Sequence, residues 1–270
     1  MTAEQEKNSR IQNSKKAGFI ILISKQINEL KKTLKPDEIA TSVADFNPKK
    51  TKLIEDTSYG WADFTDSEIT NLGTLEIISG GADFTNSKIK DLGNLKIING
   101  DAKFFRTKIK NLGNLTIIGG TAHISDTEIK DLGNLTAILS QARFMNSQVE
   151  NLGNLTTIIG YANFENSQVT DLGNLSYVGS DIYANGNKLT KEQVEQHIKK
   201  INEINIIKKG LYYFTNRIKQ NQAKSKYSTL HLISNGEYFI MKGKSNTENN
   251  YKHFFIRDLK FNDNGIISVK

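Results

Sequence analysis

Two histidines, a glutamate and an arginine in the last third of the chain are the residues best suited to acid–base chemistry. They are His231, Glu237, His253 and Arg257. Cleavage of RNA needs a proton acceptor, a proton donor and cations that stabilise the charge developing on the phosphate. These four residues could supply that set if their strands were adjacent. A lone histidine on a strand is more often structural, so a nuclease is the weaker hypothesis and we predict no catalytic residues.

Other catalytic and cofactor motifs are absent from the sequence. It contains no Walker loop, no Gly-x-Ser-x-Gly elbow and no His-Glu-x-x-His helix. It also contains no cysteine, which excludes disulfides, thiolate metal sites and a cysteine nucleophile. Asp63, Asp66 and Asp83 could be imagined as calcium ligands, but their spacing lacks the oxygen-ligand loop of such sites. We therefore predict a non-enzymatic protein without a cofactor or a metal.

A second group of residues suits binding rather than catalysis. Lys103, His123 and Arg143 recur at intervals of 20 residues. If 20 residues form one coil of a stack, neighbouring strands lie about 4.8 Å apart and these side chains form a continuous basic row. The residues expected beside this row are Phe105, Arg106, Met145 and Tyr161. Exposed aromatic and methionine side chains among arginines are typical of the centre of an interface. The alternative is that these positions vary because nothing packs on them.

A strict 20-residue repeat from Ala62 to Leu189 would position this row. Within it, alanine recurs at 62, 82, 102, 122, 142 and 162, leucine recurs at 72, 92, 112, 132, 152 and 172, and a glycine follows each of those leucines. A period of this length predicts a solenoid, in which each repeat buries its apolar face against its neighbours. The segment Ala-x-Phe predicts a short strand with the alanine and the aromatic ring pointing inward. Asn or Asp before Leu-Gly predicts a turn, because its side chain can bond to nearby backbone and glycine can adopt a positive φ.

The inward positions resemble those of the leucine-rich-repeat family. Ala-x-Phe-x-x-Ser-x-Ile-x-x-Leu overlays on Leu-x-Leu-x-x-Asn-x-Leu-x-x-Leu, and Asn187 stands where the family has its asparagine. Earlier coils carry a hydroxyl there, at Ser67, Ser87, Thr107, Thr127, Ser147 and Ser167. We expect these buried hydroxyls to satisfy backbone groups of the turn. The chain is similar to bacterial 20-residue variants of the form Leu-Gly-Asn-Leu-x-x-Ile-x-Gly. The resemblance implies a parallel-strand solenoid over residues 61–189, with about seven coils and a concave binding face.

Residues 1–60 are predicted to form a helical N-terminal cap. An apolar stripe over residues 14–35 has the spacing of an amphipathic helix and consists of Ile20, Ile23, Ile27, Leu30 and Leu34. Proline and acidic residues predict a second short helix from Pro36 to about Ala44. A cap would cover the strand edges and the core at an open end of the solenoid. The apolar run at 17–23 is short and lacks a small-residue cleavage site, so we predict a buried helix turn rather than a signal peptide.

Residues 190–270 are predicted to form a basic α+β domain or cap. Thr190 and Gln193 fit a capping box at the start of a helix. Strands at 227–234 and 237–242 flank Asn235-Gly236, a strong hairpin signal, and two more strands are expected at 252–261 and 266–269, giving an antiparallel sheet. Residues 186–270 hold 16 Lys and Arg against 7 Asp and Glu, whereas residues 61–185 hold 9 against 14. Aromatic and basic residues over 212–226 make nucleic-acid binding by this domain an alternative.

Together these features predict a non-enzymatic protein–protein interaction module that uses the outward strand residues of a capped solenoid. One alternative is an effector whose basic C-terminal domain binds or cleaves nucleic acid. Another is a structural component of a phage or other large assembly, because the heavy use of Asn, Lys and Ile fits an AT-rich bacterial or phage genome. No stretch approaches a membrane-spanning length, so we expect a cytoplasmic or virion-associated protein without a membrane partner.

Overall fold

The computed structural model describes residues 3–55, 60–184, 189–202, 227–232, 238–243, 251–255, 259–261 and 267–269. Side chains are described for residues 9, 11–55, 60–184 and 189–202. The chain divides into two compact units, residues 1–198 and residues 199–270. The repeat and the long N-terminal helix belong to the first unit, and the antiparallel strands near the C-terminus belong to the second.

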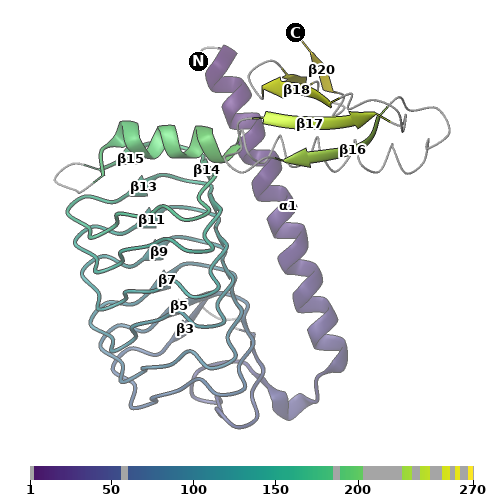
Figure 1. The fold of residues 1–270 in the computed structure, drawn as a ribbon. Helices are drawn as coiled ribbons and strands as arrows, with labels where there is room; N and C mark the ends of the chain where they lie inside the picture. The colour runs from purple at the N-terminus through teal and green to yellow at the C-terminus, as the bar shows by residue number, and fades with distance from the viewer. Residues whose placement is uncertain are drawn as a thin grey trace. The chain divides into compact units, whose positions relative to one another are not determined.

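The repeat forms a parallel β-solenoid of about six coils with 20 residues in each coil. Each coil contributes one short strand to each of two parallel sheets (Figure 1). Sheet 1 consists of β1 (Ile39–Ala40), β2 (Leu53–Ile54), β4 (Ile77–Ile78), β6 (Ile97–Ile98), β8 (Ile117–Ile118), β10 (Ala137–Ile138), β12 (Thr157–Ile158) and β14 (Tyr177–Val178). Sheet 2 consists of β3 (Trp61–Asp63), β5 (Gly81–Asp83), β7 (Ala102–Lys103), β9 (Ala122–His123), β11 (Ala142–Arg143), β13 (Ala162–Asn163) and β15 (Ile182–Tyr183). The predicted Ala-x-Phe strand is therefore confirmed, and the Ile-Ile segment of each coil adds a strand that was not predicted.

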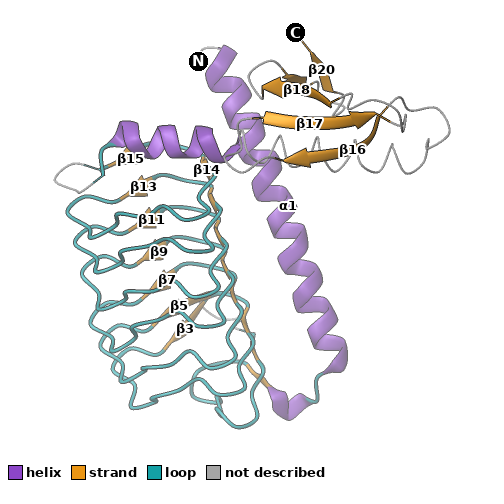
Figure 2. Cartoon of the chain, viewed as in Figure 1, coloured by secondary structure: helices purple, strands orange, loops and turns teal. Residues whose placement is uncertain are grey.

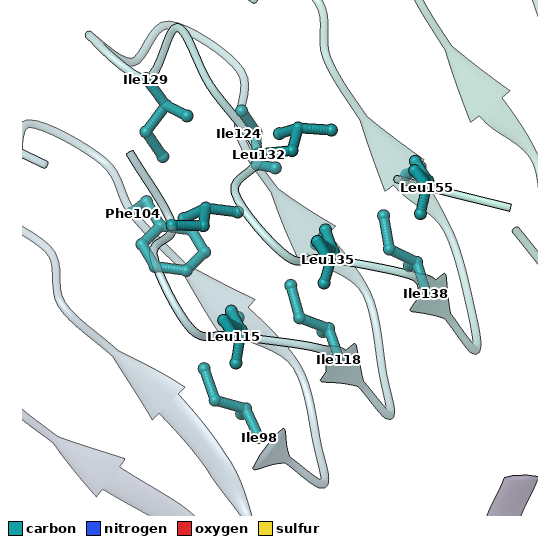
Figure 3. Packing of buried hydrophobic residues seen from close by; sticks show 14 of the residues in the cluster. Ile98, Phe104, Leu115, Ile118, Ile124, Ile129, Leu132, Leu135, Ile138 and Leu155 are labelled. Carbon is teal, nitrogen blue, oxygen red and sulfur yellow. The ribbon is translucent and has the colours of Figure 1, made fainter. Parts of the chain in front are cut away.

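The space between the two sheets is filled by the invariant apolar residues of the repeat. The alanines of sheet 2 and the leucine of each Asx-Leu-Gly turn are 0–4% exposed. Phe64, Phe84 and Phe104 stack on one another with ring centroids 5.3 and 5.4 Å apart, and Phe144 stacks on Phe164 in the same way. Ile124 interrupts this stack and remains fully buried (Figure 3). Identical side chains at one position of successive coils thus form continuous rows, which is how a solenoid buries its core.

The predicted Asx-Leu-Gly turn is confirmed. Asn71 accepts a hydrogen bond at Oδ1 from the Gly73 amide at 2.5 Å, and Gly73 has a φ of +60°. The same bond recurs in each following coil, at Gly93, Gly113, Gly133, Gly153 and Gly173. Asn and Asp alternate at the first position of this turn, so that Asn151 donates from Nδ2 to Asp171 Oδ2 at 2.6 Å. Because Asn and Asp alternate, two carboxylates never face each other at this position of neighbouring coils.

The hydroxyl row after the sheet 2 strands behaves in three ways. Ser67 and Ser167 accept through Oγ from the amides of Ile69 and Val169, at 3.1 and 3.4 Å. Thr107 and Thr127 donate through Oγ1 to the carbonyl oxygens of Phe104 and Ile124, at 3.0 and 2.8 Å. Ser87 and Ser147 are buried, and their Oγ atoms have no hydrogen-bond partner within the described part of the chain. The expected satisfaction of turn backbone by these hydroxyls therefore holds at both threonines and at Ser67 and Ser167, and fails at Ser87 and Ser147.

The helix α1 (Ala3–Thr33) runs along sheet 1 (Figure 2) rather than across the end of the solenoid. Ile23 is buried against the outward side chains of sheet 1, and Phe19, Ile27, Leu30 and Leu34 pack beside it. Gln12 Nε2 donates to the carbonyl oxygen of Ile159 at 2.6 Å near the far end of the sheet. The predicted role of the helix as an end cap is therefore wrong, because the apolar face that it covers lies along the side of the coils.

Two other predictions for residues 1–60 need correction. Ile20, Ile21 and Leu22 are 49%, 69% and 42% exposed, so the apolar run at 17–23 is not a buried helix turn and only Ile23 is buried in it. The expected second helix is a single 3-10 turn, η1 (Pro36–Glu38), followed at once by β1. β1 pairs in parallel with β2, so residues 39–54 extend sheet 1 by two strands at the N-terminal end of the solenoid.

A helix over residues 191–202 follows the last coil. Its capping box is confirmed, because the Gln193 amide donates to Thr190 Oγ1 at 3.3 Å and the Thr190 amide donates to Gln193 Oε1 at 2.7 Å. Val194 is fully buried in the main core, and Leu189 and Ile198 pack against that core. This helix therefore covers the apolar interior at the C-terminal end of the solenoid.

The second unit contains two antiparallel groups of strands. β16 (Tyr227–Leu232), β17 (Tyr238–Gly243) and β18 (Tyr251–Phe255) form one sheet, and β19 (Leu259–Phe261) pairs with β20 (Ile267–Val269). The expected hairpin turn Asn235-Gly236 and residues 212–226 lie outside the described residues. The α+β domain expected for residues 190–270 stays a prediction. Among the helices that the structure describes, none is long and apolar enough to cross a membrane.

Candidate partner-binding face

The three predicted basic residues are neighbours on the outer side of sheet 2. Lys103 on β7 pairs in register with His123 on β9, which pairs in register with Arg143 on β11. All three residues are half-buried. They alternate along their strands with fully buried alanines, which fixes their side chains on the outer side. The predicted row is therefore present, and its members differ in what they contact.

Lys103 is neutralised within the solenoid. Its Nζ lies 2.9 Å from Asp83 Oδ2 on β5 and 4.3 Å from the centroid of the Trp61 ring on β3. Gly81 stands between the coils of Trp61 and Lys103, and a Cβ at this glycine would lie 2.9 Å from the Trp61 ring. Burial acts to raise the pKa of the Asp83 carboxyl, but hydrogen bonds from Thr85 and Lys103 outweigh it and hold this pKa below its ordinary value. Lys103 and Asp83 thus form a charge pair that needs no partner.

His123 lies between two cations and against an aromatic ring. Its imidazole is 5.8 Å from the Phe105 ring, centroid to centroid, and tilted by 55°. Burial lowers the pKa of His123, and the positive charges of Arg143 and Lys103 lower it further, against the opposing effects of Asp101 and Asp83. The imidazole is therefore neutral at pH 7, and it presents one N–H donor and one acceptor.

Arg143 differs from Lys103 because its charge meets no carboxylate in the part of the chain that the structure describes. Its Nη2 and Nε donate to Gln141 Oε1 at 2.7 and 3.2 Å, and its guanidinium lies 6.0 Å from the centroid of the Tyr161 ring. Tyr161 in turn contacts Tyr183 edge-on, with centroids 5.8 Å apart. A neutral amide and a ring hold this guanidinium in place, and its charge is not neutralised.

Arg106 and Met145 lie at the turn that leaves sheet 2. The side chain of Met145 is 37% exposed, and Arg106 is exposed as well. Arg106 has a φ of 53°, in the left-handed region that Asn and Asp adopt more readily than other side chains. The equivalent positions in other coils are Asp66, Asn86, Asp126, Asn146 and Asn166. Arginine at this one position therefore departs from the residue type that the backbone favours.

Residues that sequence analysis did not single out complete the face. Trp61 lies under Lys103, Gln141 holds Arg143, and Tyr183 packs on Tyr161. Gln141 stands one 20-residue step from Tyr161, Tyr183 stands two steps from Arg143 and Trp61 stands five steps from Tyr161, so the period could have indicated them. The contacts themselves depend on side-chain direction, which the period does not specify.

The alternative sites gain no support from the geometry. Among the described residues, no group of three or more His, Cys, Asp or Glu could hold a metal ion, and this includes Asp63, Asp66 and Asp83. His231 and His253 lie on β16 and β18, which are separated by β17, and both pair in register with Ile240. The adjacency of strands on which the acid–base proposal depended is therefore absent between these two residues. Glu237 and Arg257 lie outside the described residues.

Comparisons with known protein families, with curated proteins and with solved structures found no match for this chain. The fold itself defines the chain as a parallel β-solenoid with 20-residue coils and an N-terminal helix.

Proposed function

We propose that the chain is a non-enzymatic protein-binding module of the leucine-rich-repeat type, and that it binds its partner through the outer side of sheet 2. The observation that carries the proposal is the contrast between the two sheets. Outward residues of sheet 1 are apolar except for Thr157, and they form one buried cluster with α1. Outward residues of sheet 2 change from coil to coil and combine aromatic, cationic and methionine side chains, as interface centres do.

Fixed geometry also supports a binding role for this face. The side chains of Trp61, Arg143 and Tyr161 are held by the contacts described above, so a partner would order few further rotamers on binding. Such preorganisation lowers the entropic cost of association. The repeated core residues keep the backbone of the face regular, although the outward residues differ from coil to coil.

The test is co-purification from the native host with quantitative mass spectrometry. We expect Phe105→Ala and Tyr183→Ala to lose a partner that the parent chain retains, because each removes an aromatic contact area from the face. Lys88→Ala is the matched control. Lys88 is exposed and lies outside the sheet 2 strands, and its Nζ is 2.8 Å from Glu68 Oε2. A partner that both aromatic variants retain as well as the control would contradict the proposal. Thermal unfolding of each variant shows whether the fold is intact.

A further inference from the structure

We propose that the partner presents an acidic side chain to Arg143 and His123, so that the sheet 2 face recognises an acidic segment of a protein. This inference rests on the proposed function and specifies the chemistry of the partner. It starts from the different environments of two cations in the same row. Lys103 is paired with Asp83 at 2.9 Å, whereas Arg143 is held by the neutral Gln141 at 2.7 Å.

Arg143 is built to receive a charged acceptor. Its guanidinium is half-buried, and two of its donors are oriented by one amide oxygen. A guanidinium has five N–H donors, so others remain for a ligand, and its planar shape matches a carboxylate. Charge-assisted hydrogen bonds of this kind are about twice as strong as neutral ones.

His123 supplies the second donor on the adjacent strand. Its pKa is lowered by burial and by Arg143 and Lys103, so the imidazole is neutral and donates one N–H at pH 7. The positive charge of Arg143, which opposes protonation of His123, favours a bound anion. Neighbouring strands are about 4.8 Å apart, so one carboxylate can lie within reach of both side chains.

A protein segment fits this face better than a nucleic acid does. Residues 61–185 hold 14 Asp and Glu against 9 Lys and Arg, so a polyphosphate backbone would meet net repulsion along the coils. Asp83 and Asp101 are themselves near His123 and oppose a continuous anion. A single carboxylate flanked by apolar side chains matches Arg143 beside Tyr161 and the neighbouring His123 beside Phe105.

The experiment measures binding of a capped Ala-Leu-Glu-Leu-Ala peptide to the full chain by NMR at low salt, with the His123 ring signals as the reporter. The same peptide with glutamine in place of glutamate is the uncharged control. We expect the glutamate peptide alone to shift the His123 signals, and Arg143→Gln to weaken that binding by about tenfold, which is the loss of one charge-assisted hydrogen bond. Arg143→Lys should retain part of the binding, because it keeps the charge but loses the planar guanidinium that Gln141 orients. Lys88→Gln should change it by less than about twofold.

Three results would overturn the inference. One is equal binding of the two peptides, and another is equal binding of the glutamate peptide by the parent and Arg143→Gln. The third is a capped hexauridylate that shifts the His123 signals at lower concentration than the glutamate peptide does. If Phe105→Ala and Tyr183→Ala lose a partner that Arg143→Gln retains, the proposed function holds and the acidic-segment inference fails.

Discussion

Sheet 1 and sheet 2 are built from the same coils, yet their outward side chains differ in kind. In sheet 1 the outward row contains Leu53, Ile77, Ile97 and Ile117, all 0–5% exposed beneath or beside α1. In sheet 2 the equivalent row contains Asp83, Lys103, His123 and Arg143, each half-buried. The repeat alone therefore does not decide what an outward position contains. The sheet 1 row, which packs against α1, is apolar from Leu53 to Ala137 and ends in Thr157 and Tyr177, whereas the sheet 2 row, without such packing in the described structure, carries charged and aromatic side chains.

The largest expected effect is a difference in the free energy of unfolding between a substitution on the outer side of sheet 1 and one beside sheet 2. Ile97→Ala should lower the free energy of unfolding by about 2–4 kcal/mol, because it removes a side chain buried between sheet 1 and α1. Met145→Ala, on the sheet 2 side and 37% exposed, should change it by less than about 0.5 kcal/mol. Urea unfolding of both variants measures the difference. Equal losses in the two variants would show that the faces do not differ as described.

A smaller effect is expected in the turn that leaves sheet 2. Thr127→Val removes the donor to the Ile124 carbonyl oxygen and should cost about 1–2 kcal/mol. Ser87→Ala removes a buried hydroxyl that has no partner in the described structure, and should be neutral or stabilising. Thermal unfolding of the pair checks this prediction. A loss at Ser87 as large as that at Thr127 would mean that the Ser87 hydroxyl has a partner.

The next prediction concerns the charge pair of sheet 2 and its pH dependence. The pKa of Asp83 is lower in the folded chain, so its ionised form stabilises the fold above its ordinary pKa. This stabilisation is lost as the pH falls through the lowered value. Asp83→Asn should therefore cost about 0.2–1 kcal/mol at pH 7, and this cost should shrink as the pH falls towards 2, measured by urea unfolding. A difference that persists unchanged at pH 2 would refute the assigned cause.

Much of the solenoid was predictable, because the residues that define it face the core in every coil. Ala62, Phe64 and Leu72 recur with a fixed spacing, and the Asx-Leu-Gly turn has its own backbone chemistry. The second strand was missed because both of its residues are apolar. Ile78 faces the core and Ile77 faces α1, so no alternation marks the strand.

The course of α1 could not be predicted from its own stripe. An amphipathic pattern shows that a helix covers an apolar surface but does not show which one. The outward isoleucines at 77, 97 and 117 were the missing signal, since apolar residues on the outer side of a coil need a cover. In the candidate site, the row Lys103, His123 and Arg143 followed from the period. The pairing of Lys103 with Asp83 did not, because charge partners depend on side-chain direction.

The smallest expected effect on stability is that of a substitution at Arg106, in the turn that leaves sheet 2. Arg106→Asn places a residue that tolerates the left-handed backbone at a φ of 53°, and should stabilise the fold by about 0.5 kcal/mol. The same change should weaken partner capture if the arginine serves the sheet 2 face. Thermal unfolding and co-purification of this variant measure the two effects. A destabilised variant would contradict the account of this turn.

The most direct test of the central claim is site-specific photo-crosslinking in the native host. A crosslinking residue at position 145 reports on the sheet 2 face, and one at position 88 reports on an exposed edge of the same coils. Sheet 2 as the recognition face predicts a discrete crosslinked protein from position 145 that is absent from position 88. The same set of crosslinked proteins from both positions, or none from position 145, would contradict it.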